Sequence, residues 1–456
     1  MMKILRKTIW TDGQIIPLPP EEITVVDDPD LKTHGKLRVT VYDQPKQEIF
    51  GFGGAFTEAS AHNYALLPPD EKQKALELLF GAEGLNYRFC RVCLGSCDFS
   101  LSDYRYASDE TLADFSIDHD RAEIIPFIRD AQSYRGGDLV IFASPWSPPA
   151  FFKTTGSVIG GHLRDDCYEK YAEYFALFIE AYAREGIRVS YVTPQNEPGL
   201  HRWEGCIWSD GEMARLVTSL GEAFARHGLD TRILAWDYNR AGMFDHVRRL
   251  MRSPAARYVG GVGFHWYNGI HTGELDATHD IYPELPLIET EFCHGLGARM
   301  YGRYRTELMD VLGHHANAVV EWNLLLNAEG GPYHNRDIGC NSPVWYDAES
   351  GEVKKRSIYS QMYLFSHFIQ PGARVLYTSA ALRDMMTVAV RNPDGHVLIY
   401  LYNNSHEDAE ALMVWEGEYR WHTAAPAGCL VLWELAGKPR QAARAHARWS
   451  DVKTSS

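Results

Sequence analysis

The sequence lacks an excess of basic charge and lacks long apolar runs. Its 456 residues include 60 Asp and Glu against 45 Lys and Arg, which gives a formal net charge of −15. A nucleic-acid or acidic-membrane partner requires a basic surface, so this charge argues against both. No window approaches the roughly 18 consecutive apolar residues of a membrane-spanning helix. We therefore expect neither a nucleic-acid partner nor a membrane span.

The first residues also lack the features of a secretory signal. Such a signal needs an unbroken apolar run of about 7–15 residues before its cleavage site. Here Ile4 and Leu5 are followed at once by Arg6 and Lys7. We therefore expect a cytoplasmic protein, in which the sequon at Asn403 would not be glycosylated.

Cysteine is sparse, and only three of the eight cysteines are clustered, in the pattern Cys90-x2-Cys93-x3-Cys97. A disulfide framework is not expected in a long chain of a reducing compartment. The cluster lacks a fourth cysteine or a pair of histidines, so the favoured interpretation is three small buried hydrophobic side chains. An unrelated metalloenzyme built on this cluster is an alternative. No other pattern calls for a metal or a cofactor.

Several catalytic motifs are absent. The sequence contains no Gly-x-Ser-x-Gly, no Gly-x4-Gly-Lys-Ser/Thr and no His-Glu-x2-His, which are typical of serine hydrolases, P-loop enzymes and zinc proteases respectively. Hydrophobic residues make up 45% and aromatic residues 12%. This composition is typical of a globular protein and excludes a disordered one.

Short apolar runs alternate with amphipathic stretches between residues 48 and 370. The clearest amphipathic stretch is 166–186, where apolar side chains recur every three or four positions. The eight apolar runs are 49–55, 87–95, 139–144, 189–194, 232–236, 261–265, 285–291 and 318–323. Strands that alternate with helices predict parallel βαβ units. Eight units predict an α/β fold, a (β/α)8 TIM barrel, with an open doubly wound sheet as the alternative.

The two ends of the chain have a different pattern. Residues 373–435 show short strand-like runs separated by turn signals such as Asn392-Pro393-Asp394-Gly395,. Residues 22–26 and 36–42 are also strand-like. We predict a β-sandwich formed by 1–47 plus 371–437, attached without a flexible linker to the side of a barrel of residues 48–370. Residues 438–456 are expected to form a flexible tail.

Carboxylates occur where the predicted strands end, and barrels place their reactive residues at those ends. The fourth strand leads into TPQNEP (193–198), and the seventh contains Glu289 and Glu291. Two carboxylates can divide glycosidic bond cleavage between them, one donating a proton while the other attacks or activates water. Pro198 should break its strand and leave Glu197 at the barrel rim. Period-two alternation puts Glu289 and Glu291 on one face and does not choose between them.

Seven segments at these strand ends occur in a distinctive order. They are GFGGAFTEAS (51–60), RVCLGSCDFS (91–100), SPWSPPAFFKT (144–154), TPQNEP (193–198), GFHWY (263–267), ETEFC (289–293) and EWNLLLNAEGGP (321–332). As a set they resemble glycoside hydrolase family 30, which includes glucosylceramidases and β-glucosidases. The resemblance implies a TIM barrel with a β-sandwich from both chain ends, a retaining double displacement and no cofactor.

The resemblance also implies roles for individual residues. Glu197 corresponds to the acid/base and Glu291 to the nucleophile, which selects Glu291 over Glu289. The residues implied to bind the sugar are Asp98, Trp146, Asn196, His265, Tyr267 and Trp322. The loop 333–341 departs from the glucosylceramidase pattern, and its sugar-contacting residue has no assigned counterpart here.

These implications predict a retaining exo-β-glycosidase of the β-glucosidase or glucosylceramidase type, with a small carbohydrate or β-glycoside as substrate. A glucosylceramidase would belong to sphingolipid metabolism. The alternatives within the family are a β-xylosidase, a β-fucosidase and an endo-β-glucanase. A non-catalytic carbohydrate-binding protein on the same fold is the alternative of a different class. The sugar, the aglycone and the assembly state, including a homo-oligomer, stay open.

Overall fold

The computed structural model describes residues 2–11, 14–18, 22–23, 37–200, 203–296, 301–336, 339–380, 384–415 and 419–436. The predicted tail 438–456 lies outside these residues. The chain divides into two compact units, one from its two ends, up to Gln44 and from Leu376, and one from its middle, Pro45–Val375. None of the described helices is long and apolar enough to cross a membrane.

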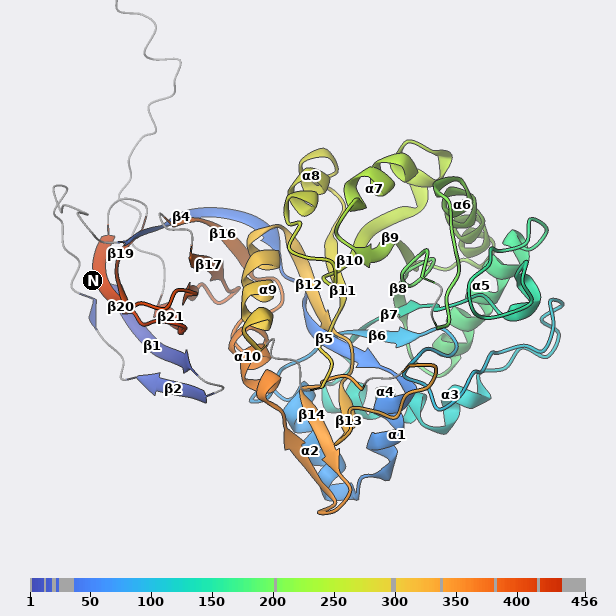
Figure 1. Ribbon diagram of the computed structural model, residues 1–456, viewed down its shortest axis with the longest axis horizontal. Helices are drawn as coiled ribbons and strands as arrows, with labels where there is room; N and C mark the ends of the chain where they lie inside the picture. Colours follow the sequence, from blue (N-terminus) through green and yellow to red (C-terminus); the bar gives the residue numbers. More distant parts are fainter. Residues whose placement is uncertain are drawn as a thin grey trace, which may run out of the picture. The chain divides into compact units, whose positions relative to one another are not determined.

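The middle unit is a closed barrel of eight parallel strands (Figure 1). Each of the eight predicted apolar runs overlaps one of them, so the predicted TIM barrel is confirmed. The strands, in barrel order, are β5 (Gly51–Phe56), β6 (Phe89–Cys93), β7 (Val140–Ser144), β8 (Val189–Val192), β9 (Arg232–Asn239), β10 (Val259–His265), β11 (Leu287–Phe292) and β12 (Ala316–Glu321).

Every barrel strand is followed by at least one helix. The helices are α1 (Glu58–Leu66), α2 (Pro69–Phe80), α3 (Asp118–Ala122), α4 (Ile124–Tyr134), α5 (Tyr168–Arg184), α6 (Asp210–His227), α7 (Met243–Met251), α8 (Gly273–Ile281), α9 (Tyr301–Gly313) and α10 (Ser357–Ser366), with 3₁₀ turns at Ala150–Phe152 and Pro254–Tyr258. Helix α5 confirms the amphipathic pattern of 166–186. A small sheet that the sequence did not predict joins β13 (Leu325–Asn327), β14 (Val344–Asp347) and β15 (Glu352–Lys355).

Two layers of side chains fill the barrel, because alternate residues of each strand face inwards. The lower layer is apolar and consists of Phe89, Phe142, Leu234, Ile288, Ala318 and Val320. The upper layer, nearer the C-terminal ends of the strands, is polar and consists of Arg91, Ser144, Thr193, Asp237 and Thr290, all buried. Buried polar groups are tolerated when they bond to one another, and this layer forms the base of the candidate site.

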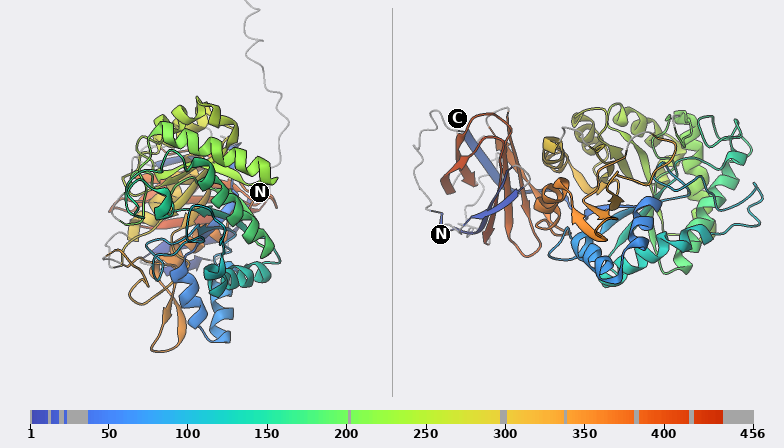
Figure 2. Two further views of the ribbon diagram at one scale, coloured as in Figure 1. Left: turned by 90° about the vertical axis from the view of Figure 1, so that its right-hand side faces the viewer. Right: turned by 60° about the horizontal axis from the view of Figure 1, so that its bottom comes forward.

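The end unit is one mostly antiparallel sheet in which strands from both ends of the chain pair (Figure 2). Its strands are β1 (Met2–Thr11), β2 (Gln14–Leu18), β3 (Glu22–Ile23), β4 (Leu37–Glu48), β16 (Arg374–Ala380), β17 (Met385–Arg391), β18 (Val397–Asn403), β19 (Ala409–Trp415), β20 (Tyr419–Ala425) and β21 (Leu430–Ala436). The sheet curls, so that β18 also contacts β20, and side chains from β4 and β16–β21 share one apolar core. This arrangement confirms the predicted sandwich of chain ends.

Candidate active site

A cavity of about 310 Å³ lies at the C-terminal ends of the barrel strands. The structure brings together at this cavity seven residues predicted from the sequence, namely Asp98, Trp146, Asn196, Glu197, Tyr267, Glu291 and Trp322. His265, the eighth, is fully buried beside it. The sequence analysis missed six further lining residues, which are Leu200, Trp203, Tyr238, Asn239, Cys293 and Arg336.

Glu197 and Glu291 face each other across this cavity. One carboxylate oxygen of Glu197, one of Glu291 and a ring nitrogen of His265 all lie within 4.8 Å of one another. Glu197 has a positive φ of 48°, and its backbone N–H donates to Asp237 O at 2.9 Å. A left-handed conformation is costly for a residue other than glycine, and here it turns the Glu197 side chain into the cavity.

Glu291 reaches the cavity through an irregularity in β11. Ile288 and Thr290 face the barrel interior, so strict alternation would turn both Glu289 and Glu291 outwards. Against β12, the pairing register of β11 shifts between Glu289 and Phe292. Against β10, the register shifts between Phe264 and His265, which are the partners of Glu289 and Glu291. The expectation that Glu289 and Glu291 share one face is therefore wrong, because a bulge re-aims the second side chain.

Glu289 is buried on the helix side of β11, away from the cavity. Its pKa is raised well above the usual range by burial and by the neighbouring carboxyl group of Glu307, although Arg240 acts in the opposite direction. Glu289 therefore belongs to the packing between β11 and α9. The structure separates the two candidates that the sequence pattern alone did not.

Arg91 connects the residues below the cavity. Its Nη1 donates to Glu291 Oε2 at 2.6 Å, and its Nη2 donates to Asn196 Oδ1 at 2.8 Å and to Asp237 Oδ2 at 2.9 Å. The guanidinium is fully buried. A planar guanidinium with several donors suits such a convergent arrangement. Arg91 was not singled out in the sequence, because a charged residue inside an apolar run carries no signal of its partners.

Asp237 and His265 complete this buried network. Asp237 Oδ1 accepts from Thr290 Oγ1 at 2.6 Å and contacts His265 Nε2 at 3.1 Å. Burial raises the pKa of Asp237, but Arg91 and His265 outweigh this effect and hold it well below its usual range. Burial lowers the pKa of His265, but the carboxylates of Glu291, Asp237 and Glu197 outweigh it and bring it to about 9. His265 is therefore an imidazolium at neutral pH.

The two oxygens of Glu291 are both held by donors. Arg91 bonds Oε2, and Tyr267 OH donates to Oε1 at 2.8 Å. Burial is the largest influence on Glu291 and raises its pKa, while His265 and Arg91 act to lower it. These donors favour the carboxylate form and fix its orientation, as is required of a group that acts through a charged oxygen.

Two tryptophans form an aromatic wall of the cavity. The rings of Trp146 and Trp322 stack with centroids 4.8 Å apart and an angle of 21° between their planes. The Arg91 guanidinium lies 4.7 Å from the centroid of Trp146 and 5.4 Å from that of Trp322. Arg91 therefore fixes the aromatic wall as well as the carboxylates, and a flat apolar face of a ligand can pack against such rings.

Arg336 belongs to the loop 333–341, in which the sequence analysis assigned no sugar-contacting residue. Its Nη1 donates to Asp98 Oδ2, and its guanidinium lies over the rings of Phe99, at 4.7 Å, and Trp203, at 5.7 Å. Burial raises the pKa of Asp98, while Arg336 acts to lower it. A lone arginine in a loop carries no sequence signal, so only the folded chain places it against Asp98.

The clustered cysteines lie in the core. Cys93 and Cys97 pack with Trp146 and Trp322 in one apolar cluster, whereas Cys90 lies on the other face of β6. All eight cysteines are buried free thiols. This placement agrees with the favoured interpretation of packing side chains.

Glu197, His265 and Glu291 are close enough together to share a cation. A histidine ligand needs a deprotonated ring nitrogen. Because both nitrogens of His265 contact carboxylates and its pKa is about 9, the ring presents hydrogen-bond donors at neutral pH. The three side chains therefore fit a hydrogen-bonded network around a protonated histidine better than a metal centre.

Comparison with known proteins agrees with this geometry. The model of the glycosyl hydrolase family 30 TIM-barrel domain matches residues 49–369. The chain belongs to glycosyl hydrolase family 30. Membership in family 30 makes the protein a glycoside hydrolase, an enzyme that acts on the glycosidic bonds of carbohydrate substrates.

Several relatives span most of this family 30 chain. Lysosomal acid glucosylceramidase of Mus musculus is 32% identical over 408 residues, which cover 83% of this chain and 79% of the relative. Endo-1,6-beta-D-glucanase neg1 of Aspergillus fumigatus is 26% identical over 420 residues, which cover 86% of this chain and 85% of the relative. Among solved structures, SrfJ from Salmonella typhimurium superposes with a TM-score of 0.88 at 28% identity, covering 96% of this chain and all of that one.

Proposed function

We propose that the protein is a retaining exo-β-glycosidase that releases a terminal β-D-glucosyl unit. The supporting observation is the pair of carboxylates, Glu197 and Glu291, with oxygens within 4.8 Å of each other. Retaining enzymes hold their two carboxyl groups about 5–5.5 Å apart, whereas inverting enzymes leave about 6.5–9.5 Å for a water molecule. The short separation favours direct attack by one carboxylate.

In the first step Glu291 attacks the anomeric carbon. The two donors Arg91 and Tyr267 keep its carboxylate charged and oriented. Glu197 gives its proton to the glycosidic oxygen, so the bond between that oxygen and the anomeric carbon breaks as the glycosyl–Glu291 ester forms. The aglycone leaves as an alcohol.

In the second step water replaces the aglycone. Glu197, now a carboxylate, takes a proton from the water while the water oxygen attacks the anomeric carbon. The ester to Glu291 breaks, and the sugar leaves with its β configuration. The imidazolium of His265, 3.2 Å from Glu197 Oε1, stabilises the Glu197 carboxylate after each proton donation.

The proposal of exo action is supported by the contact between two loops. Arg336, in the loop after β13, lies over Trp203, in the loop after β8, beside Asp98. Both side chains line the cavity, and a contact between two loops of its lining favours a terminal sugar over an internal one. A glucosyl unit is supported by the relatives, whose names include glucosylceramidases and endo-1,6-beta-D-glucanases. The cytoplasmic location stays a prediction.

A substitution of the nucleophile tests this function. Glu291→Ala should abolish turnover of p-nitrophenyl β-D-glucoside, and added azide should restore it and give the α-glucosyl azide, identified by anomeric NMR. Near-normal activity of Glu291→Ala would refute the assignment.

A panel of p-nitrophenyl β-glycosides tests the sugar. A preference for xyloside or fucoside would move the assignment to the β-xylosidase or β-fucosidase alternative. Internal cleavage of a β-1,6-glucan, seen as long products, would favour an endo-β-glucanase instead.

A further inference from the structure

Three loops that line the catalytic cavity meet at one histidine, His334. His334 lies in the loop after β13, two positions before Arg336. Its ring contacts the loop after β6 and the loop after β8. Those two loops carry Asp98 and Trp203, which line the cavity, whereas His334 itself is not among the lining residues.

Both ring nitrogens of His334 are engaged. Nδ1 donates to the backbone oxygen of Ser100 at 3.0 Å, and Nε2 lies 2.8 Å from Asp103 Oδ1. A carbonyl and a carboxylate only accept hydrogen bonds, so both nitrogens carry a proton. Burial lowers the pKa of His334, but its hydrogen bonds to Glu204 and Asp103 outweigh this effect and bring it to about 9. The ring is therefore an imidazolium at neutral pH.

Glu204 is the acidic group on the third side of this cation. Its Oε1 lies 3.2 Å from His334 Nε2, and its Oε2 accepts from Ser96 Oγ at 2.9 Å. Burial raises the pKa of Glu204, while His334 and Ser96 act to lower it and Asp103 to raise it. Lys153, after β7, also interacts electrostatically with Glu204. Without its charge, His334 would no longer offset the repulsion between Glu204 and Asp103.

The segment 334–336 also holds the predicted sugar-binding residue Asp98. The backbone N–H of His334 donates to Asp98 O at 3.0 Å. Two residues later, Arg336 Nη1 donates to the Asp98 carboxylate, and its guanidinium lies 5.7 Å from the centroid of Trp203. Trp203 directly precedes Glu204 in the chain. The partners of His334 and Arg336 are thus neighbours in both adjoining loops.

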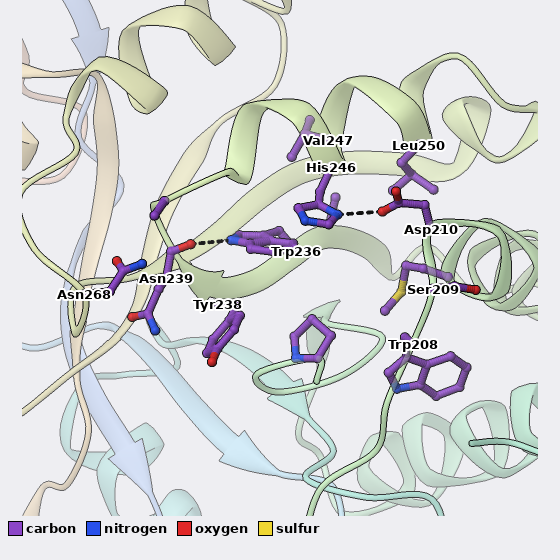
Figure 3. A pocket seen from close by; sticks show the side chains of 14 residues that line it. Trp208, Ser209, Asp210, Trp236, Tyr238, Asn239, His246, Val247, Leu250 and Asn268 are labelled. Atoms are coloured by element: carbon purple, nitrogen blue, oxygen red, sulfur yellow. Dashed lines mark hydrogen bonds and ion pairs between the residues drawn. The ribbon is translucent and has the colours of Figure 1, made fainter. Parts of the chain in front are cut away.

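A second pair of a histidine and an acid, His246 and Asp210, has a different position (Figure 3). His246 lines a neighbouring cavity of about 380 Å³, lies 2.6 Å from Asp210 through Nδ1 and stacks on Trp236 with ring centroids 4.5 Å apart. This pair joins α7 to the first residue of α6. It connects two helices around the barrel, whereas His334 connects loops that carry residues of the catalytic cavity.

We infer that His334 is a positioning residue, whose imidazolium ring holds the loops after β6, β8 and β13 together and so keeps Asp98 and Arg336 in place for the sugar. The inference rests on the proposed function and adds to it a residue that sets the affinity for the sugar from outside the cavity lining. Because His334 acts through Asp98, its loss should change KM more than kcat.

The variant His334→Ala tests this role with p-nitrophenyl β-D-glucoside as substrate. We expect KM to rise by about tenfold at pH 7, which corresponds to the loss of one charged hydrogen bond, with kcat nearly unchanged. His314→Gln is the control, because His314 pairs with Asp276 at 2.8 Å away from the catalytic cavity. A folded His334→Ala enzyme with the KM of wild type, or with a loss in kcat alone, would overturn the inference.

The pH dependence of KM separates a role of the charge from a merely structural one. The ratio of the KM of His334→Gln to that of wild type should be largest near pH 7. It should fall towards about one near pH 10, because wild type then loses the same charge. His265 and Lys153 titrate in both proteins, so their effects cancel in the ratio. A ratio above one that does not change with pH would overturn the role of the imidazolium, and this variant decides the test if His334→Ala does not fold.

A metal ion is the competing explanation for this cluster. Ligand atoms of His334, Asp103 and Glu204 all lie within 4.8 Å of one another. Treatment with EDTA and addition of Zn²⁺ should leave the KM of wild type unchanged if the proton is the bridging cation. A KM that rises with EDTA and is restored by Zn²⁺ would overturn the inference in favour of a metal site.

The outcomes separate this inference from the proposed function. Failure of the wild-type enzyme to cleave any p-nitrophenyl β-glycoside would overturn both. Normal cleavage by wild type together with an unchanged KM in His334→Ala and His334→Gln would overturn the role of His334 alone.

Discussion

Arg91 on β6 donates Nη1 to Glu291 Oε2 at 2.6 Å, across the interior of the barrel. The same guanidinium bonds Asn196 and Asp237. One buried cation therefore positions the predicted nucleophile, a predicted sugar-binding residue and the carboxylate that contacts His265. Its removal would leave buried carboxylates without their partner.

Arg91→Met should lower the free energy of unfolding by about 3–5 kcal/mol, because breaking a buried ion pair leaves an uncompensated charge. It should also abolish most activity, since Glu291 loses a donor. Urea denaturation and kcat/KM measure the two effects. Arg88→Met is the matched control, because Arg88 pairs with the exposed Asp138 and such pairs contribute about 0–1 kcal/mol. Equal effects of the two variants would contradict the role of Arg91.

Tyr267→Phe should reduce kcat/KM by about 10- to 100-fold, because Glu291 Oε1 loses the hydroxyl that donates to it at 2.8 Å,. The hydroxyl also contacts Cys293 Sγ at 3.5 Å, but the phenyl ring keeps its packing. Steady-state kinetics on p-nitrophenyl glucoside measure the loss. Tyr134→Phe, on the exposed face of α4, should behave as wild type; an active Tyr267→Phe enzyme would show that Arg91 alone suffices.

His265 should make stability depend on alkaline pH. Its pKa rises from 6.5 to about 9 in the folded protein, so its charge stabilises the fold fully below pH 6.5 and this contribution is lost as the pH rises through about 9. The loss amounts to about 3 kcal/mol. Denaturation at about pH 6 and about pH 9.5 measures it, and His265→Gln should show a correspondingly smaller decrease. If the free energy of unfolding fell equally with pH in wild type and in His265→Gln, the prediction would be contradicted.

Arg336→Ala should raise KM more than it lowers kcat, because Arg336 contacts Asp98, which is predicted to bind the sugar rather than to react with it. The loss of this cation should also raise the pKa of Asp98 further, since burial already raises it and Arg336 opposes that effect. KM of the variant should therefore increase at acidic pH relative to wild type. A pH series of KM tests this, with Arg121→Ala on the exposed surface as control. If the ratio of the KM of Arg336→Ala to that of wild type did not change with pH, the prediction would be contradicted.

The sequence predicted the barrel well because its signals are local. Each parallel strand is buried on both faces and therefore reads as a short apolar run, and each amphipathic helix has its own periodicity. Active-site residues of such barrels lie at the C-terminal ends of the strands, and this rule placed Glu197 and Glu291 at the same face of the barrel. The roles of these two residues stay predictions until the variants are measured.

The choice between Glu289 and Glu291 is an example of a feature that local sequence patterns do not predict. Alternation assigned both to one face, and a register shift in β11 separates them. Arg336 was missed for a related reason: its partner Asp98 lies 238 positions away in the chain. A sequence read one segment at a time does not report which distant residues meet.

The sequence by itself determined the number of barrel strands, the helices between them and the family, because those properties depend on patterns along the chain. The tertiary structure decided which side chains point into the cavity, the charge of His265 and the loops that meet at His334. Those properties depend on bulges, burial and partners from separate strands, and they exist only once the barrel closes.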